Sequence, residues 1–190
     1  MSVLRVLHLV GSATDDFYCD LSRLYAEDCL EFTANAALYE FHIAYVTPDR
    51  QWRFPTSLSP ESINLAAPMS LSEAVRVLTT LKIDVMLPQM FCISGMTSYR
   101  TLFDLLNIPY VGNLPDLMAL AANKAKTKAI VAAAGVIVPH GELLHPGDLP
   151  KISTPAVIKP VDTDNSLGLA FVKNAADYDA ALQTAFTHAD

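Results

Sequence analysis

Two short lysine-bearing segments contain the residue types that could bind a polyphosphate. The first, Asn123-Lys-Ala-Lys-Thr-Lys128, places Lys124 and Lys128 four residues apart on one side of an expected helix. Like charges at that spacing repel each other weakly, and a bound anion would relieve the repulsion. Taken alone, however, such a lysine cluster is typical of a solvated helix face.

The second segment is Ala156-Val-Ile-Lys-Pro160, which is followed by a polar loop that reaches Gly168. A lysine at the end of an apolar strand, here Lys159, can hold its charge over a loop of backbone N–H groups, and such loops bind phosphate oxygens. The same residues fit equally well a strand that ends at the surface with its lysine in water. Each segment alone therefore leaves both interpretations open.

The elements that must position these lysines differ between the two halves of the chain. In the first half, apolar runs predict strands at residues 3–10, 41–45, 85–88 and 109–112. Helical spacing predicts helices over residues 17–29 and 97–106, and Ser70 with Glu73 forms a capping-box pattern that opens a helix through Leu81. Residues 49–68 are rich in Pro and Ser and predict a long surface loop. This alternation indicates an α/β fold with a mostly parallel sheet.

The second half has the pattern of a small α+β module, with a boundary near Met118. We expect one helix over residues 116–134, short strands near 141–144, 156–159 and 168–172, and a last helix from about residue 175. The module has few strands to bury the apolar face of its last helix. We therefore expect domains at residues 1–118 and 119–190, the second one incomplete, and we favour a fragment.

Five segments in this order closely resemble D-alanine–D-alanine ligases, which belong to the ATP-grasp superfamily. They are Ile108-Pro-Tyr-Val-Gly112, Ala121-Ala-Asn-Lys-Ala-Lys-Thr-Lys128, Ala132-Ala-Ala-Gly-Val-Ile-Val-Pro139, Val157-Ile-Lys-Pro160 and Ser166-Leu-Gly168. The resemblance covers roughly residues 102–181, and more loosely the amino-terminal strand, glycine and helix. It implies that residues 1–118 form the pre-ATP-grasp α/β domain and that residues 119–190 begin the central ATP-grasp subdomain.

The resemblance also implies an ATP-dependent carbon–nitrogen ligase with ATP and Mg²⁺ as cofactors. By position, Lys124 and Lys159 match the family's phosphate-binding lysines, and Ser166 and Gly168 match its phosphate-covering loop. In that loop, Asp164 and Asn165 replace the family's first Gly and Ser. The family's magnesium carboxylates and adenine hinge lie beyond the matched region, so we expect no metal ligand here and no catalysis by these 190 residues alone. No catalytic residue is assigned.

The segments that would bind substrate depart from the family pattern. The family anchors its first substrate with a Glu after a Gly-Gly loop, where this sequence has Gly11-Ser-Ala-Thr-Asp-Asp16, so Gly11, Asp15 and Asp16 become the candidate substrate-binding residues. The family's His-Gly and acidic groups are missing from residues 90–98. These departures indicate a different first substrate.

The segments at residues 7–23, 46–54 and 88–92 resemble one branch of the family, the cyanobacterial ligase of mycosporine-like amino acid biosynthesis. That branch joins serine or threonine to mycosporine-glycine, which is therefore the expected reaction. The alternatives are a D-alanine–D-alanine ligase of peptidoglycan synthesis and a non-catalytic binding module that keeps the fold.

The composition excludes several other classes. A net charge of −7 gives no basic face for nucleic acid, and 52% apolar residues with 17% charged residues indicate a packed globular protein. The apolar stretches are too short for a membrane span, and no secretory signal is visible, so a cytoplasmic location is expected. The three cysteines and five histidines show no metal-binding spacing. Small-molecule substrates are the expected partners, and a homodimer is left open.

Overall fold

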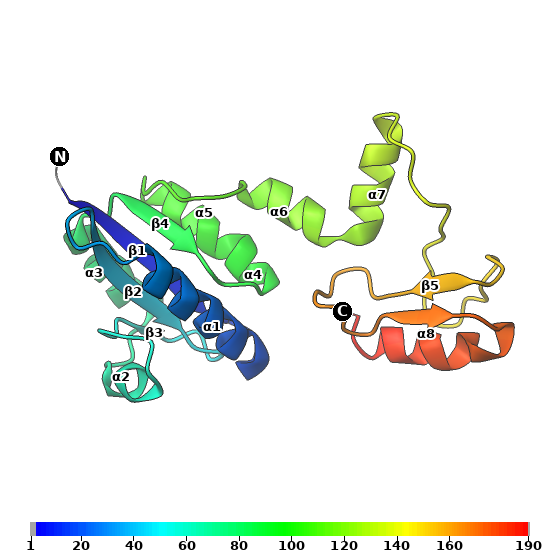
Figure 1. Cartoon of the computed structure of the whole chain (residues 1–190), viewed down its shortest axis with the longest axis horizontal. Coiled ribbons are helices and arrows are strands. Elements are labelled where there is room, and N and C mark those ends of the chain that lie inside the picture. The colour runs from blue at the N-terminus through cyan, green and yellow to red at the C-terminus, as the bar shows by residue number, and fades with distance from the viewer. Residues whose placement is uncertain (1–2, 190) are drawn as a thin grey trace. The chain divides into compact units, whose positions relative to one another are not determined.

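A computed structural model describes residues 3–189 of the chain. The chain divides into two compact units, Met1–Ala119 and Leu120–Asp190, and each is described below by itself (Figure 1). Within the described residues, no helix has both the length and the apolar character needed to cross a bilayer.

The first unit is built on a four-stranded sheet of order β3-β2-β1-β4. Its strands are β1 (Leu4–Gly11), β2 (Tyr39–Val46), β3 (Trp52–Arg53) and β4 (Val85–Pro88). β1 pairs in parallel with β2 on one side and with β4 on the other, and the short β3 pairs antiparallel with the end of β2. The parallel pairs confirm the α/β class that the sequence predicts.

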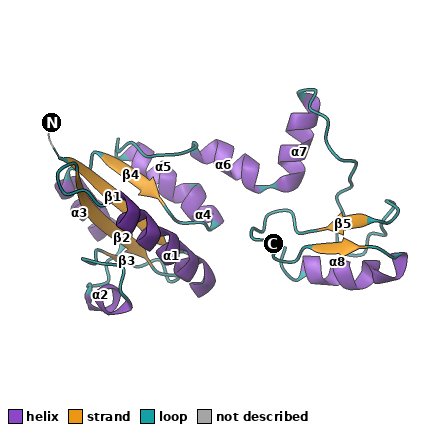
Figure 2. Ribbon diagram, viewed as in Figure 1, coloured by secondary structure: helices purple, strands orange, loops and turns teal. Residues whose placement is uncertain are grey.

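Helices cover both faces of this sheet (Figure 2). They are α1 (Asp16–Thr33), α2 (Pro60–Leu65), α3 (Leu71–Leu81), α4 (Ile93–Met96) and α5 (Ser98–Leu105). Successive β1 side chains point to opposite faces, so Val10 packs in one buried cluster with Ala26 of α1, and Leu9 packs in another with Leu78 of α3 and Phe103 of α5. The capping box predicted at the start of α3 is confirmed.

Two sequence predictions for this unit are wrong in detail, and one short helix was not predicted. The expected loop over residues 49–68 contains β3 and α2, because Trp52 is buried and exchanges two backbone hydrogen bonds with Met69. The expected strand at residues 109–112 is only an isolated bridge from Tyr110 to Met86. The short helix α4 precedes the predicted helix and was not expected.

The second unit pairs a two-stranded antiparallel sheet with helices. Its elements are α7 (Lys124–Ala133), β5 (Ala156–Ile158), β6 (Ala170–Val172), the 3₁₀ turn η1 (Ala175–Asp177) and α8 (Tyr178–Phe186), while α6 (Pro115–Ala122) spans the boundary between the units. Val172 of β6 and Ala181 and Ala185 of α8 are the buried apolar residues of this sheet–helix layer.

The single helix expected over residues 116–134 is wrong, because the chain breaks at Asn123. Asn123 has extended backbone angles, and its side chain accepts a hydrogen bond from the Lys126 N–H, as a helix-capping residue does. Lys124 is therefore the first residue of a new helix. The strand expected near residues 141–144 does not form.

Candidate functional site

The loops that follow β1, β2 and β4 meet at the carboxyl edge of the first unit's sheet. The Ser12 N–H donates to the Val46 carbonyl over 3.0 Å. The hydroxyl of Ser22 in α1 accepts from the Gly11 N–H (2.8 Å) and donates to the Gln89 carbonyl (2.6 Å), which ties the β1 and β4 loops together. Open α/β sheets bind ligands at this edge, so the loops are where a substrate is expected.

Gly11 has a structural reason to be glycine. Its φ is +101°, and a Cβ added there would lie 2.0 Å from the Val46 carbonyl oxygen. Side chains are excluded by both the backbone conformation and the neighbouring strand end. Gly11 shapes the turn, so its residue type does not by itself indicate a ligand contact.

The two candidate carboxylates differ in what they do. Asp15 caps α1: its carboxylate accepts from the Tyr18 N–H at 2.8 Å and from the Thr14 hydroxyl at 3.0 Å. Asp16 is the first residue of α1 and is exposed, and within residues 3–189 its carboxylate makes no hydrogen bond or ion pair. Of the two, only Asp15 has a structural role in the described residues, as the cap of α1.

Cys92 belongs to the same group of loops, although it was not among the candidate residues predicted from the sequence. Burial raises the pKa of its thiol, but hydrogen bonds from Ser94, from the backbone of Ala13 and Gly95, and from Ser12 together hold that pKa below its ordinary value. Cys92 and Ala13 are far apart in the chain, so only the parallel sheet brings them together. The usable signal was the position of Cys92 just after the end of a buried strand.

His8 lies under this edge as a fully buried polar group. Its Nδ1 lies 3.0 Å from the Gln89 side-chain oxygen, and its Nε2 is buried without a hydrogen-bond partner. Burial lowers the pKa of His8 below the ordinary value of 6.5, and the Gln89 contact offsets this only partly. His8 is therefore held neutral in the folded state.

We expect acid to destabilise the first unit through His8. The unfolded chain binds a proton as the pH falls through 6.5, whereas the folded state resists it, so stability is lost as the pH falls from 6.5 toward the lowered pKa. The slope for one proton is at most about 1.4 kcal/mol per pH unit. Urea unfolding between pH 7.5 and 5, followed by fluorescence of the only tryptophan, Trp52, measures it.

The matched control is His8→Leu, which removes the titrating group and should flatten the pH dependence over this range. If the free energy of unfolding of that variant still falls with pH at the same slope, groups other than His8 cause the acid sensitivity.

In the second unit, Lys124 is fixed against the loop that follows β5. Its backbone N–H donates to the Val161 carbonyl over 2.8 Å. Its ammonium group donates to the Thr163 carbonyl and lies 3.5 Å from the Val161 carbonyl. The start of α7 and the residues just after Lys159 therefore form one local structure.

The loop itself has a backbone shape suited to an anion. Asn165, Ser166 and Gly168 have positive φ values of 54°, 59° and 71°. Successive residues in such turn conformations can direct several N–H groups into one concavity, which attracts negative charge. Gly168 is required there, because a Cβ would lie 2.8 Å from a Pro160 ring carbon.

Lys159 is exposed and makes no hydrogen bond or ion pair with any described residue. No direct contact joins it to Lys124, whose ammonium instead binds carbonyl oxygens of the loop. The two lysines thus flank the start of one loop. Lys124 is hydrogen-bonded to the loop, and Lys159 directly precedes it in the sequence. Both ammonium groups lack a carboxylate partner within residues 3–189, so an anion would face no competing ion pair.

A magnesium site does not fit the residues at hand. Between residues 3 and 189, no group of three or more His, Cys, Asp or Glu side chains is placed to hold a metal ion.

Comparison with known proteins points to one family. No protein-family model matches the chain. The D-alanine–D-alanine ligase of Coprothermobacter proteolyticus is 28% identical over 139 residues, covering 68% of this chain and 44% of that protein. The D-alanine–D-alanine ligase of a Sulfurovum species is 38% identical over 89 residues, covering 45% of this chain and 25% of that protein. The matched part is thus less than half the length of either relative.

Solved structures agree on the fold. The D-alanine–D-alanine ligase from Coxiella burnetii superposes with a TM-score of 0.78 at 20% identity, covering all of this chain (100%) and 60% of that one. The VanG D-Ala:D-Ser ligase from Enterococcus faecalis gives 0.73 at 20% identity, covering 98% of this chain and 60% of that one. The chain therefore shares the fold of the matched part of these ligase structures.

Proposed function

We propose that this chain forms the substrate-facing domain and the first part of the nucleotide site of an ATP-dependent carbon–nitrogen ligase. The observation that carries the proposal is the attachment of Lys124 to the loop after Lys159. Together with the positive-φ turn at Asn165, Ser166 and Gly168, it makes a compact loop beside two lysines, and that loop also contains Asp162 and Asp164. Such a loop suits a polyphosphate, and the ligase-like fold supports the same assignment.

In this proposal each group has a defined task. Lys124 and Lys159 neutralise phosphate charge, and the N–H groups around Ser166 and Gly168 cover the phosphate oxygens. ATP, when bound, supplies the phosphoryl group that turns a substrate oxygen into a leaving group. The chain's own contribution is to position the reactants and stabilise charge. Lys124 must leave its loop carbonyls to reach a phosphate, so nucleotide binding should rearrange that contact.

We further propose mycosporine-glycine and a small hydroxy amino acid, serine or threonine, as the substrates. The support is the amino-terminal resemblance and the absence of the family's His-Gly and acidic groups after β4. A D-alanine–D-alanine ligase is the second candidate, favoured by the names of the matched relatives. A non-catalytic module would keep the fold without turnover.

One assay separates these functions. The whole protein is supplied with ATP, Mg²⁺ and each substrate pair, and phosphate release is measured while product absorbance is followed in the ultraviolet. Phosphate release with an absorbing product from mycosporine-glycine and serine supports the proposal. Release with D-alanine alone supports the second candidate, and no release with any pair supports a binding module.

Lys159→Ala should weaken ATP binding or turnover of the whole protein by at least about tenfold. A charge-assisted bond from an ammonium to phosphate contributes about 1.5–3 kcal/mol, and 1.4 kcal/mol corresponds to one factor of ten. Lys173→Ala is the matched control, because Lys173 lies beyond β6 over the Phe171 ring and should leave ATP kinetics unchanged. Equal ATP kinetics for the two variants would show that Lys159 does not bind the nucleotide.

A further inference from the structure

Part of strand β2 is an unpaired sheet edge. β2 pairs with β1 over its whole length but with β3 only at Tyr45 and Val46. The carbonyls of Leu38 and Val46 accept hydrogen bonds from the β1 side, so the even-numbered residues of β2 direct their backbone groups to β1. The backbone N–H and C=O groups of Phe41 and Ile43 therefore point away from the sheet. Within the described part of the chain they bind no other group.

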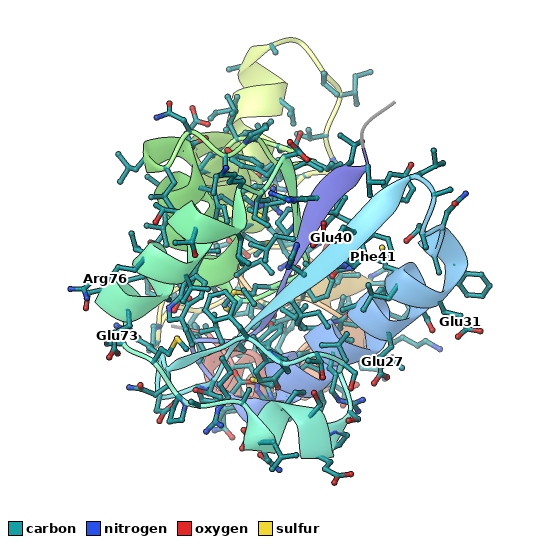
Figure 3. All side chains as sticks on the ribbon, turned by 90° about the vertical axis from the view of Figure 1, so that its left-hand side faces the viewer. Glu27, Glu31, Glu40, Phe41, Glu73 and Arg76 are labelled. Carbon is teal, nitrogen blue, oxygen red and sulfur yellow. The ribbon has the colours of Figure 1, made fainter. Side chains whose placement is uncertain are left out.

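This edge lies at the bottom of a groove between two helices. The groove has a volume of about 710 Å³, and its walls come from α1, α3 and the segment before α2. Its apolar lining includes Leu30 of α1, Leu58, and Val77 and Leu81 of α3. Figure 3 looks onto the edge, with α1 on one side of β2 and α3 on the other. An open edge with apolar walls is the form of site to which an extended peptide adds as a strand.

The charged residues on the walls of the groove indicate what kind of peptide could bind in it. α1 has five acidic residues and a single basic one, Arg23, which pairs with Glu27 at 2.7 Å. Glu31, one turn further along, is exposed and makes no ion pair with any described residue. Glu40 of β2 already pairs with Arg5 at 3.4 Å, and Glu73 and Arg76 lie together on α3, on the other side of the groove from α1 (Figure 3). Basic side chains on an incoming strand would thus meet carboxylates on the α1 side.

A second copy of the chain fits this charge pattern less well. Pairing two β2 edges would bring two acidic α1 helices to the same interface, and like charges at an interface oppose association. A basic segment of another protein has no such conflict.

We propose that the β2 groove binds an extended segment of another protein that alternates basic and apolar residues. The segment adds as a strand to β2 by hydrogen bonding to Phe41 and Ile43. Its apolar side chains pack on Val77 and Leu81 of α3, and its basic side chains approach Glu27 and Glu31 of α1. The groove is formed by the first unit alone, so this binding is independent of any nucleotide site.

The probe is the synthetic peptide Lys-Val-Lys-Val-Lys-Val-amide with fluorescein on its amino terminus; the 190-residue chain is titrated into it and binding is followed by fluorescence anisotropy. Backbone amide NMR reports the place of binding, and the signals of Phe41 and Ile43 should move. Val77→Arg fills the groove with a charged side chain and should weaken binding at least about tenfold, because it blocks the strand and repels its lysines. Thr79→Arg adds the same charge on the exposed side of α3 and should bind within about twofold of the unchanged chain.

A second peptide separates strand addition from simple charge attraction. N-methylation at alternate residues keeps every side chain but removes the N–H groups of one peptide edge, and it should weaken binding at least about tenfold. Equal binding of the methylated peptide, equal binding by Val77→Arg, or unmoved Phe41 and Ile43 signals would each overturn the proposal. Sedimentation showing a dimer in which these two amides become protected from exchange would also overturn it, in favour of a second copy.

Discussion

The whole protein is expected to use mycosporine-glycine with serine about a thousandfold more efficiently than a pair of D-alanines, measured as kcat/KM. The segment after β4, at residues 90–98, lacks the family's His-Gly and acidic groups. The family's Glu after the Gly-Gly loop is also missing from residues 11–16, so a D-alanine ammonium would lack its usual ionic partner, and an unpaired buried charge commonly costs about 3–5 kcal/mol. Each 1.4 kcal/mol is a factor of ten, so a loss of about a thousandfold follows.

Phosphate release at a range of concentrations of each substrate pair gives the two kcat/KM values. A D-alanine–D-alanine ligase assayed in parallel should show the reverse preference and so controls for the assay. Efficient synthesis of D-alanyl-D-alanine, without an ultraviolet-absorbing product, would place the protein among the cell-wall ligases.

Gly11→Ala is expected to destabilise the first unit by about 3 kcal/mol or more, which is at least about a hundredfold in the unfolding equilibrium. A methyl group at residue 11 would lie 2.0 Å from the Val46 carbonyl oxygen, on a residue whose φ is +101°. The clash is with the backbone of a central strand, so no flexible side chain can move aside. Urea unfolding followed by Trp52 fluorescence measures the change within this unit.

Gly112→Ala is the matched control in the same unit. Gly112 also has a positive φ, +126°, but the atoms nearest to an added Cβ belong to side chains: Arg100 at 3.2 Å and the Pro88 ring at 4.0 Å. That contact can relax, so we expect the smaller loss of about 1–2 kcal/mol that positive φ alone causes. Similar losses for the two variants would show that the close approach of β2 is not what requires Gly11.

Elements with a strong local signal could be predicted from the sequence, and those that depend on distant contacts could not. The apolar run of β1 and the Ser70–Glu73 capping box each specify their own structure, and both are confirmed. β3 has only two residues, so its pairing with β2 leaves no periodic pattern to detect. The break at Asn123 lies within a run of good helix formers, and its side-chain cap outweighs their propensity.

The candidate site shows the same division. The sequence singles out Lys124 by motif, but its contact with the Thr163 carbonyl joins residues on separate elements and has no local signature. Likewise, Asp15 and Asp16 are neighbours of the same type in the sequence. Only the structure shows that Asp15 caps α1 while Asp16 makes no ion pair among the described residues.

The most direct test of the central claim is whether Lys124 and Lys159 bind one nucleotide together. In the whole protein with labelled lysine side chains, NMR during an ATP titration reports each ammonium group separately. Both signals should shift along one common binding curve, while those of Lys151 and Lys173 stay in place. If ATP binds and either Lys124 or Lys159 does not respond, the two lysines do not form the phosphate site, and the account is wrong.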